Sequence, residues 1–310
     1  MARFAVESWS PEYGSPVGEE GQPDLVPAAA VDPSIELPAA EWQPIDCASA
    51  DIATDVLFVD GVRRIDARLW FDIDGRSRGG IAASYAAGVI RCRDEATIEQ
   101  EAVGRGIFAM TGAATIDCGK VRYEHHPTAT EDIEQLQRGI QSEMGRMEKD
   151  LAAKAGPAEL LFLDGPLRGG ESIPGAVGYI KSHQAGYLPD EAAGVVGQLR
   201  PGQRTPLFLI QQSWSRYSWY VRLPIDLPGH PWAGIARCEV AARGTAREAA
   251  AVANRASVTL QRFASTPHKD TRAPQNLFPI AGLENHLRHC LGDREFLYRQ
   301  LRMAALAGEG

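Results

Sequence analysis

The chain has 310 residues, of which 44% are hydrophobic and 23% are charged, and its formal net charge is −8 at pH 7. These proportions are ordinary for a soluble globular protein that is long enough to bury a substantial core. The acidic balance excludes a protein that coats nucleic acid through its overall charge, so a nucleic-acid role would require a local basic channel.

Five cysteines are scattered through the chain without a C-x-x-C pair, a pattern that fits neither a disulfide framework nor a cysteine-rich zinc site. Reduced thiols in a cytoplasmic protein are the simplest interpretation. The first residues carry acids where a signal peptide needs an apolar segment, and no run of about eighteen apolar residues occurs. We therefore expect a cytoplasmic protein with no membrane span.

Residues 1–50 contain seven prolines between Pro11 and Pro44, which are incompatible with a packed helix or a central strand. They predict an extended Pro-rich arm, followed by one domain over residues 51–310. Aromatic residues such as Trp42 suggest that parts of the arm lie on the body or on a partner, because exposed tryptophan is uncommon on a free tail. A solvated leader is an equally weighted alternative.

Beyond the arm, the pattern predicts a mixed α/β domain. Residues 56–59 are an unbroken apolar run, residues 62–71 alternate in part, and residues 81–92 can form a returning strand. Residues 72–80 carry turn chemistry, with Asp74-Gly75 as the expected turn. Together these segments predict a three-stranded antiparallel meander.

A long helix is predicted over residues 130–155, because apolar residues recur there with helical period and Gly156-Pro157 ends the pattern. The apolar segment at residues 159–163 then predicts a buried strand in the same sheet as the meander. Further strands are predicted at residues 176–181, 206–212, 218–224 and 234–240, and further helices at residues 245–264 and 282–307.

Two apolar segments run directly into an Asp-Gly pair, at Asp60-Gly61 and at Asp164-Gly165. Such a pair is more often a turn, but an acid at the carboxyl end of a buried strand is costly without a cation or hydrogen-bond donors. If the two strands are neighbours, their carboxylates lie close together and need a cation between them. Each glycine would let the backbone turn away beneath the ion.

The helix predicted over residues 130–155 should supply a third acid. At about 100° per residue, its apolar side chains gather on one face, and Glu148 lies nearer the centre of that face than Glu143 does. Glu148 is therefore the first candidate and Glu143 the second. For either residue alone, an acid at the edge of a buried face carries equal weight.

An all-oxygen ligand set of Asp60, Glu148 and Asp164, with Glu143 as the alternative helix ligand, is typical of Mg²⁺ or Mn²⁺. Two such ions would support in-line hydrolysis of a phosphodiester, one by activating water and the other by stabilising the departing oxygen. Lys181, at the end of the strand predicted after Asp164, could neutralise the charge of the phosphorane. A solvated surface lysine is the commoner alternative.

Six short motifs, FVDG, LFLDGPL, GYIKSHQAGYL, WYVRLP, ARCEV and NLFPIAGLENHL, occur in this order over residues 55–295. Their order and spacing resemble the NurA nuclease family. The resemblance implies a ribonuclease H-like fold, a metal-dependent site that often prefers Mn²⁺, and activity on DNA ends. It also implies a homodimer that encloses a DNA channel and docks on a hexameric HerA-type ATPase.

Carried over residue by residue, the resemblance assigns the same two aspartates, helix glutamate and lysine, and it adds His286 as a general acid or a group that holds the scissile phosphate. His286 with His289 and Cys290 could instead form a zinc cluster, but no second ligand pair of suitable spacing follows in the sequence. A surface histidine is therefore favoured over zinc. Phe278 stands where many members have tyrosine, so no phenolic hydroxyl is present there.

A local basic surface could reconcile the acidic net charge with DNA binding. Arginines crowd the predicted meander beside Asp60 and recur in the loops after Lys181, where aromatic residues could stack on unpaired bases. Solvated arginines on the far face of core strands are an equally weighted alternative. The candidates for DNA contact are Arg63, Arg64, Arg68, Arg204 and Arg216.

Two other functions compete with a nuclease. A non-catalytic adaptor of a ring ATPase would not need the acids, yet two aspartates and a core-facing glutamate are all present. An actin-like or sugar-kinase-like ATPase also places Asp-Gly pairs at strand ends. However, no Gly-rich phosphate loop follows either aspartate, and Pro166 stands where a flexible glycine would suit phosphate better.

Overall fold

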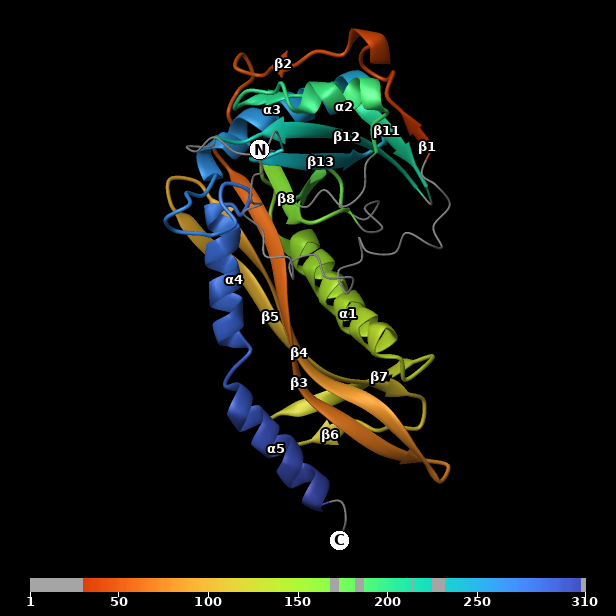
Figure 1. Cartoon of the computed structure of the whole chain (residues 1–310). Helices are drawn as coiled ribbons and strands as arrows, with labels where there is room; N and C mark the ends of the chain where they lie inside the picture. Colours follow the sequence, from red (N-terminus) through yellow and green to blue (C-terminus); the bar gives the residue numbers. More distant parts are fainter. Residues whose placement is uncertain (1–29, 168–172, 182–186, 213, 225–231, 308–310) are drawn as a thin grey trace, which may run out of the picture. The chain divides into compact units, whose positions relative to one another are not determined.

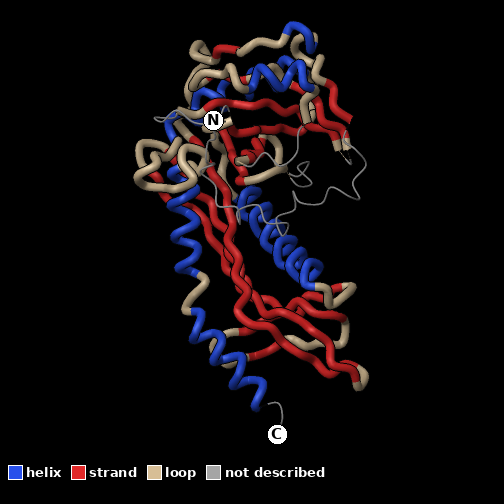
Figure 2. Tube along the Cα trace, viewed as in Figure 1, coloured by secondary structure: helices blue, strands red, loops and turns tan. Residues whose placement is uncertain are grey.

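The structure, a computed structural model, describes residues 30–167, 173–181, 187–212, 214–224 and 232–307 (Figure 1). Its internal contacts divide the chain into two compact units, which the sequence had not indicated. The first unit comprises residues 1–58, 91–97 and 157–281, and the second comprises residues 59–90, 98–156 and 282–310. Both units contain strands and helices (Figure 2), which confirms the mixed α/β class.

The first unit is built on an ordered series of strands. These are β1 (Ala30–Asp32), β2 (Ile45–Asp46), β8 (Leu160–Asp164), β9 (Ala176–Ile180), β10 (Gln203–Arg204), β11 (Phe208–Gln211), β12 (Ser215–Arg222) and β13 (Ile235–Ala241). Their order is β1-β11-β12-β13-β9-β8, and β10 pairs with β12 and β2. The pairs are antiparallel, except that β8 and β9 are parallel.

Two α-helices cover opposite faces of β12 in this unit. Trp219 donates from Nε1 to Ser257 Oγ of α3 (Ala246–Leu260) at 3.2 Å. Tyr220, which points to the other face, belongs to a buried cluster with residues of α2 (Asp190–Val196). Two 3₁₀ helices complete the unit, η1 (Ala39–Glu41) and η2 (Gln261–Phe263).

Residues 30–46 are part of this first unit rather than a free arm. Strand β1 pairs with β11 and strand β2 pairs with β10, so their backbone groups have partners within the sheet. Trp42 is 8% exposed within the hydrophobic cluster that includes Phe208, in agreement with the expectation that this aromatic lies on the body. Residues 1–29 lie outside the described part of the chain, so an arm there stays a prediction.

The second unit holds most of a meander of long strands. Its elements are β3 (Val56–Ile73), β4 (Arg76–Cys92), β5 (Ala96–Met110), β6 (Ile116–Asp117), β7 (Arg122–Thr128), α1 (Ile133–Lys154), α4 (Phe278–Cys290) and α5 (Arg294–Ala307). The strand order is β3-β4-β5-β7-β6, with β5 and β7 parallel. A three-stranded meander is thus confirmed, but its members differ from those expected.

Strand β3 is one continuous strand where the sequence predicted two, and the third strand of the meander is β5. The turn predicted at Asp74-Gly75 is confirmed, with φ of 54° and 71° at the two residues, as a tight hairpin requires. The helix predicted over residues 282–307 is instead two helices, α4 and α5, separated around Gly292. Its φ of 80° suits a glycine just past a helix end.

Helices cover both faces of the meander in the second unit (Figure 1). Ile81, Ala83 and Tyr85 of β4 belong to the buried cluster that contains Leu136, Ile140 and Met144 of α1. Gly88 lies against Leu283 and Leu287 of α4, and Ala82 belongs to a cluster with Leu301 of α5. Because odd and even positions of a strand point to opposite faces, α1 covers one face of β4, and α4 and α5 cover the other.

Among the described residues, no helix has the length and apolar character needed to cross a membrane. All five cysteines are free thiols, as the scattered spacing predicted.

A charge cluster in the first unit joins the chain segments that lead to and from the second unit. Asp55 precedes β3, Arg91 lies near the end of β4, and Pro157 follows α1. Arg91 donates to both carboxylate oxygens of Asp55 at 2.6 Å each and to the carbonyl oxygen of Pro157 at 2.6 Å. Arg93 adds a further bond to Asp55 at 3.0 Å. The hydrogen bond from Arg91 lowers the pKa of Asp55 to about 2.

Replacing the Asp55 carboxylate should lower the stability of the protein at neutral pH but not in strong acid. The pKa of Asp55 in the folded protein, about 2, lies below its ordinary value of 3.8. The contribution of the Asp55 carboxylate to the free energy of unfolding is therefore complete above pH 3.8, and it is lost as the pH falls through about 2. Asp55→Asn should lower the melting temperature at pH 7, and the gap to the wild type should close as the pH falls from about 4 to about 2.

Thermal unfolding followed by circular dichroism across this pH range measures the gap. The matched control is Asp51→Asn, which changes an exposed acid four residues earlier and should leave the melting temperature nearly unchanged. A gap that persists undiminished at pH 2 would contradict the assignment.

Candidate active site

The first unit places Asp164 and Lys181 together at the ends of two parallel strands. Asp164 is the last residue of β8 and pairs in register with Tyr179 of β9, and Lys181 directly follows β9. Lys181 Nζ lies 2.5 Å from Asp164 Oδ2. The lysine side chain is 4% exposed and that of the aspartate 14%, so Lys181 is a buried partner of the acid and not the solvated lysine of the alternative interpretation.

A chain of polar contacts holds the Lys181 ammonium in place. Lys181 Nζ donates to Asn276 Oδ1 at 2.9 Å, and Asn276 Nδ2 donates to Asp270 Oδ2 at 2.6 Å. Asp270 also accepts from the backbone N–H of Arg272 at 2.7 Å. Since Asn276 is fully buried, this chain fixes the direction in which the lysine points.

The second unit holds Asp60, and it lies inside a strand rather than at a strand end. Strand β3 continues through Asp60 and Gly61 without a break, so the expectation that the strand ends at the aspartate is wrong. Asp60 is 7% exposed. Its Oδ1 accepts from the N–H of Gly61 at 2.8 Å.

A second acid in the same unit, Glu284 of α4, lies beside Asp60. The two residues offer carboxylate oxygens within 4.8 Å of one another, and Glu284 is 8% exposed. Glu284 was not among the site residues expected from the sequence. The sequence does contain a signal for it, because this acid shares a helix face with Ile280, Leu283 and Leu287, which are fully buried.

Glu148 of α1 lies against the backbone of Gly61. A Cβ atom at Gly61 would come within 2.4 Å of Glu148 Oε1 and 2.8 Å of Met144 Cγ. The glycine therefore leaves the space that the Glu148 carboxylate occupies against β3, and it does not turn the backbone there as the sequence suggested. Gly165, with φ of 98°, does have the conformation of a turning glycine.

Glu143, the alternative helix ligand, has other partners. Its Oε2 accepts from Arg146 Nη2 at 2.7 Å, and its Oε1 lies 3.7 Å from His126 Nδ1. Glu143 is thus bonded to other groups, whereas Glu148 lies against Gly61, and the choice of Glu148 as the helix ligand stays a prediction.

His286 lies on α4, two residues after Glu284, but it contacts a different group. Two residues correspond to about 200° around a helix, so the side chains of Glu284 and His286 leave α4 on nearly opposite sides. His286 Nε2 is paired with Glu101 of β5. The role expected for His286 beside the catalytic acids is therefore not supported by its position, and Glu284 stands where that residue was expected.

The first residues of β3 lie beside β8 within the first unit. The carbonyl oxygen of Asp55 accepts from the N–H of Glu159 at 3.0 Å, and the rings of Phe58 and Phe162 stack with centroids 5.3 Å apart. Between the first contact and the second, one segment advances from Asp55 to Phe58 and the other from Glu159 to Phe162, so the two segments run in the same direction. Asp60 and Asp164 each follow the stacked phenylalanine by two residues, and residues two apart point to the same face of a strand.

Arg204, Arg216 and Arg64, all candidates for DNA contact, are bonded to carboxylates. Arg204 is fully buried and donates two bonds to Glu36, at 2.8 and 2.7 Å. Arg216 donates to the buried Glu239 at 3.1 Å. Arg64 binds the buried carboxylate of Asp66 at 2.8 Å and the carbonyl oxygen of Gly292 at 2.8 Å.

Arg204 and Arg216 are thus held inside the protein, which corrects the expectation that they face DNA. Arg64 and Arg63 are half-buried, and Arg68 is exposed.

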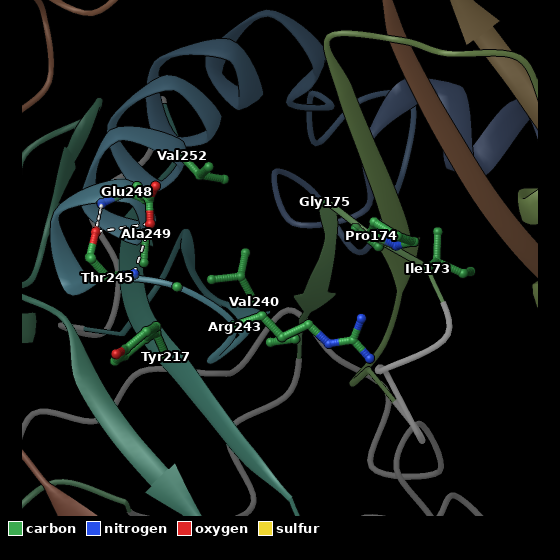
Figure 3. A pocket seen from close by; sticks show the side chains of 13 residues that line it. Ile173, Pro174, Gly175, Tyr217, Val240, Arg243, Thr245, Glu248, Ala249 and Val252 are labelled. Carbon is green, nitrogen blue, oxygen red and sulfur yellow. Dashed lines mark hydrogen bonds between the residues drawn. The ribbon is translucent and has the colours of Figure 1, made fainter.

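A pocket of about 180 Å³ opens in the first unit (Figure 3). Its walls include Tyr217 of β12, Val240 of β13 and the first turn of α3 with Thr245 and Glu248, which form a reciprocal capping box. None of the site residues expected from the sequence lines this pocket.

Comparison with known proteins gives the family and the fold. A family model described as NurA domain matches residues 54–280. The crystal structure of the NurA nuclease from Sulfolobus solfataricus is similar with a TM-score of 0.51 and 11% sequence identity, over 84% of this chain and 88% of that chain. At this identity the structural similarity concerns the fold alone. No curated protein gave a significant match.

Adding a methyl group at Gly61 should displace Glu148 and destabilise the protein. The Cβ atom would overlap Glu148 Oε1 and Met144 Cγ, and overpacking of this kind costs about 1–3 kcal/mol. Gly61→Ala should lower the free energy of unfolding by that amount in urea denaturation.

The matched control is Gly145→Ala in α1, where no atom lies within 4 Å of the added Cβ. An alanine in place of a glycine inside a helix should raise stability by about 1 kcal/mol. Equal effects of the two substitutions would show that Glu148 does not occupy the space at Gly61.

Proposed function

Because the chain belongs to the NurA family, we propose that it is a divalent-metal-dependent deoxyribonuclease that processes DNA ends in the cytoplasm, on a ribonuclease H-like fold. The family match and the similarity to a NurA nuclease structure support a nuclease. The observation that carries the proposal is the equivalent position of Asp60 and Asp164, two residues after a stacked pair of phenylalanines on parallel strands.

In this proposal the carboxylates of Asp60, Glu148, Asp164 and Glu284 are the metal ligands. Support comes from the second unit, where Asp60 and Glu284 are neighbours and Glu148 lies against Gly61. All the donors are carboxylate oxygens, which fits Mn²⁺ or Mg²⁺ and not a soft metal. Two buried acids side by side also need a cation to offset their repulsion. Two bound ions would supply an activated water and charge stabilisation for phosphodiester hydrolysis.

Lys181 acts on the phosphate in this proposal. Its ammonium, held by Asn276 and directed at Asp164, carries a positive charge that is already oriented before substrate binds. A fixed charge in a site with little water stabilises the extra negative charge of a pentavalent phosphorus more than a mobile lysine could. The Asn276–Asp270 contact positions the lysine and does not touch the substrate.

DNA contact falls to Arg63 and Arg68 of β3 among the arginines considered. Both follow Asp60 on the same strand, and Arg68 is exposed. Guanidinium groups on this strand would bind phosphate oxygens of the strand being cut. A local basic surface of this kind suffices in a protein with a net charge of −8.

The partners in this proposal are a second copy of the chain and a hexameric HerA-type ATPase. Exposed apolar side chains on α5 offer a surface for a protein contact. Leu297 and Leu301 of α5 are buried, whereas Phe296, Met303 and Leu306 are 38%, 63% and 63% exposed. At about 100° per residue these three share the side of α5 away from the buried leucines, a pattern typical of a helix with a partner on each side.

The proposed nuclease activity can be tested on linear single- and double-stranded DNA with Mn²⁺ or Mg²⁺. Asp60→Asn, Glu148→Gln, Asp164→Asn and Glu284→Gln should each lower the rate by about a hundredfold or more, because each removes a charge that holds the metal. Lys181→Met should lower kcat more than it raises KM, since the lysine acts on the transition state. Gel assays with a chelator control measure these rates.

Glu143→Gln is the matched control on the same helix, and it should keep wild-type activity because Glu143 binds Arg146. Metal-independent cleavage would overturn the metal role of the acids. A wild-type protein that cleaves no DNA, with or without a HerA-type ATPase, would instead favour the non-catalytic adaptor.

The dimer contact can be tested on α5. Met303→Asp with Leu306→Asp places two charges on the exposed apolar side and should convert a dimer to a monomer in size-exclusion chromatography with light scattering. Arg294→Asp, at an exposed position of the same helix turned away from the apolar side, is the control for added negative charge and should leave the oligomer intact. A wild-type monomer at micromolar concentration would contradict the homodimer.

A further inference from the structure

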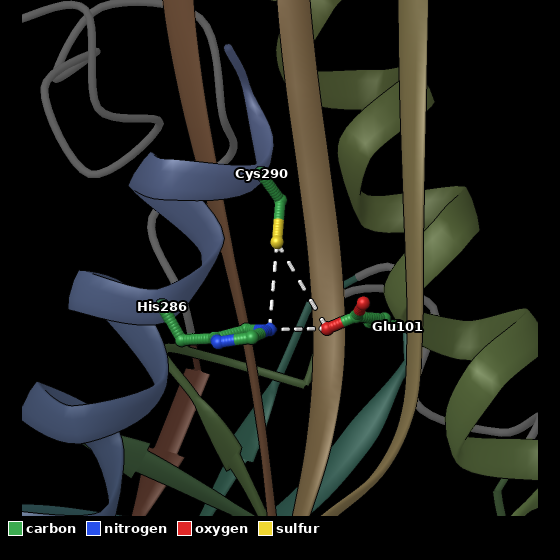
Figure 4. Close-up of side chains that lie close together, drawn as sticks. All are labelled: Glu101, His286 and Cys290. Atoms are coloured by element: carbon green, nitrogen blue, oxygen red, sulfur yellow. Dashed lines mark hydrogen bonds and ion pairs between the residues drawn. The ribbon is translucent and has the colours of Figure 1, made fainter.

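Three chemically different side chains meet in the second unit, away from the acids described above (Figure 4). Glu101 lies on β5, and His286 and Cys290 lie four residues apart on α4. Residues four apart share one face of a helix, so both point to the strand. Glu101 Oε2, His286 Nε2 and Cys290 Sγ all lie within 4.8 Å of one another.

The three groups converge on a single point. His286 Nε2 is paired with Glu101 Oε2, and Cys290 Sγ lies 3.4 Å from His286 Nε2 and 3.9 Å from Glu101 Oε2. A nucleophilic triad needs the thiol and the carboxylate on different ring nitrogens, one to lose a proton and the other to orient the ring. Here both face Nε2, which is the arrangement of ligands around an ion.

The geometry and the donor types suit zinc. Bond lengths of about 2.0 to 2.3 Å at a tetrahedral Zn²⁺ separate its ligand atoms by about 3.3 to 3.6 Å. The two sulfur distances, 3.4 and 3.9 Å, are already near these values, and only the carboxylate and imidazole must move apart. A thiolate, an imidazole and a carboxylate form a mixed set that binds zinc, unlike the all-oxygen set at Asp60.

The backbone around this cluster is held in place. Arg105 donates to the carbonyl oxygen of Leu291 at 3.2 Å, and Arg64 donates to that of Gly292 at 2.8 Å. These bonds fix the end of α4 directly after Cys290, while Glu101 is carried by a strand of the meander. The ligands are therefore set on rigid elements, and only side-chain rotations are needed to close on an ion.

We propose that Glu101, His286 and Cys290 bind one Zn²⁺ ion, with water as the fourth ligand. The side chains of His286 and Glu101 are 41% and 46% exposed, so an ion can enter from solvent and keep a water. The ion ties the end of α4 to β5. Because Glu284 leaves the other side of α4, the same ion steadies the helix that presents this acid to Asp60.

This zinc site goes beyond the proposed nuclease and does not depend on it. Its ligands are not shared with the carboxylates proposed to hold Mn²⁺ or Mg²⁺, and its role is to fix α4. The sequence had disfavoured zinc at His286 because it shows no second ligand pair of suitable spacing. The third ligand of this site, Glu101, lies 185 residues away in the chain.

The test is titration of the metal-free full-length protein with Co²⁺, a spectroscopic substitute for Zn²⁺. The wild type should bind one Co²⁺ with a near-ultraviolet charge-transfer band from the Cys290 thiolate, and Zn²⁺ should displace it. Cys290→Ser should abolish the band. His286→Ala and Glu101→Gln should each weaken Zn²⁺ binding at least about tenfold, since each removes one of three protein ligands.

Two controls separate this site from others. His289→Ala, on the same helix but outside the cluster, should bind Co²⁺ as the wild type does. Asp60→Asn should also keep the charge-transfer band, whatever its effect on DNA cleavage. Zn²⁺ should raise the melting temperature of the wild type but not of Cys290→Ser. A wild type without the band, or a band that survives in Cys290→Ser, would overturn the proposal.

Discussion

A carboxylate removed from water must be offset by a cation or by hydrogen-bond donors, and the arrangement around Asp164 depends on this constraint. Lys181 supplies the cation at 2.5 Å, and Asn276 fixes the lysine by accepting a bond at 2.9 Å. The parallel pairing of β8 and β9 is what brings the two residues together, because Asp164 ends one strand and Lys181 follows the other. Sheet register therefore determines the electrostatics around Asp164.

In the second unit, steric space determines how α1 lies against β3. A side chain at Gly61 would overlap Glu148 and Met144 of α1, so the glycine determines how closely that helix approaches β3. The two Asp-Gly pairs thus use glycine for different reasons. At Gly165 the backbone has a positive φ, which favours glycine, whereas Gly61 continues an extended strand and leaves room for an acid. Gly165 thus lets the chain turn after Asp164. Gly61 instead leaves room for the side chain of Glu148 next to the strand that carries Asp60.

Buried arginines limit the surface that could bind DNA. Arg204, Arg216 and Arg64 each neutralise an acid of their own unit, Glu36, Glu239 and Asp66 respectively. A guanidinium bonded to a carboxylate inside the protein is a structural group, because releasing it would leave an unpaired charge there. Arg64 in addition binds the end of α4, the helix that carries Glu284, His286 and Cys290. A single strand, β3, thus contributes both to the proposed nuclease site and to the support of that helix.

The sequence by itself determined the features that depend on neighbouring residues. Hydrophobic period predicted α1, apolar runs predicted the strands that lead to Asp60 and Asp164, and turn chemistry predicted the turn at Asp74-Gly75. All of these are present. The helix face also ranked Glu148 above Glu143. These signals are local, because period and turn chemistry act over a few residues.

Only the tertiary structure decided which distant residues meet. An acid on the apolar side of a helix, such as Glu284, has the same local pattern whether it pairs with Asp60 or lies at the edge of the core. Arg204 likewise has the pattern of a loop arginine until its pairing with Glu36 is known. Glu101 and His286 are separated by 185 residues, and their contact depends on how α4 packs on the meander. The physical reason is that strand pairing and helix packing join segments far apart in the chain, which local pattern does not encode.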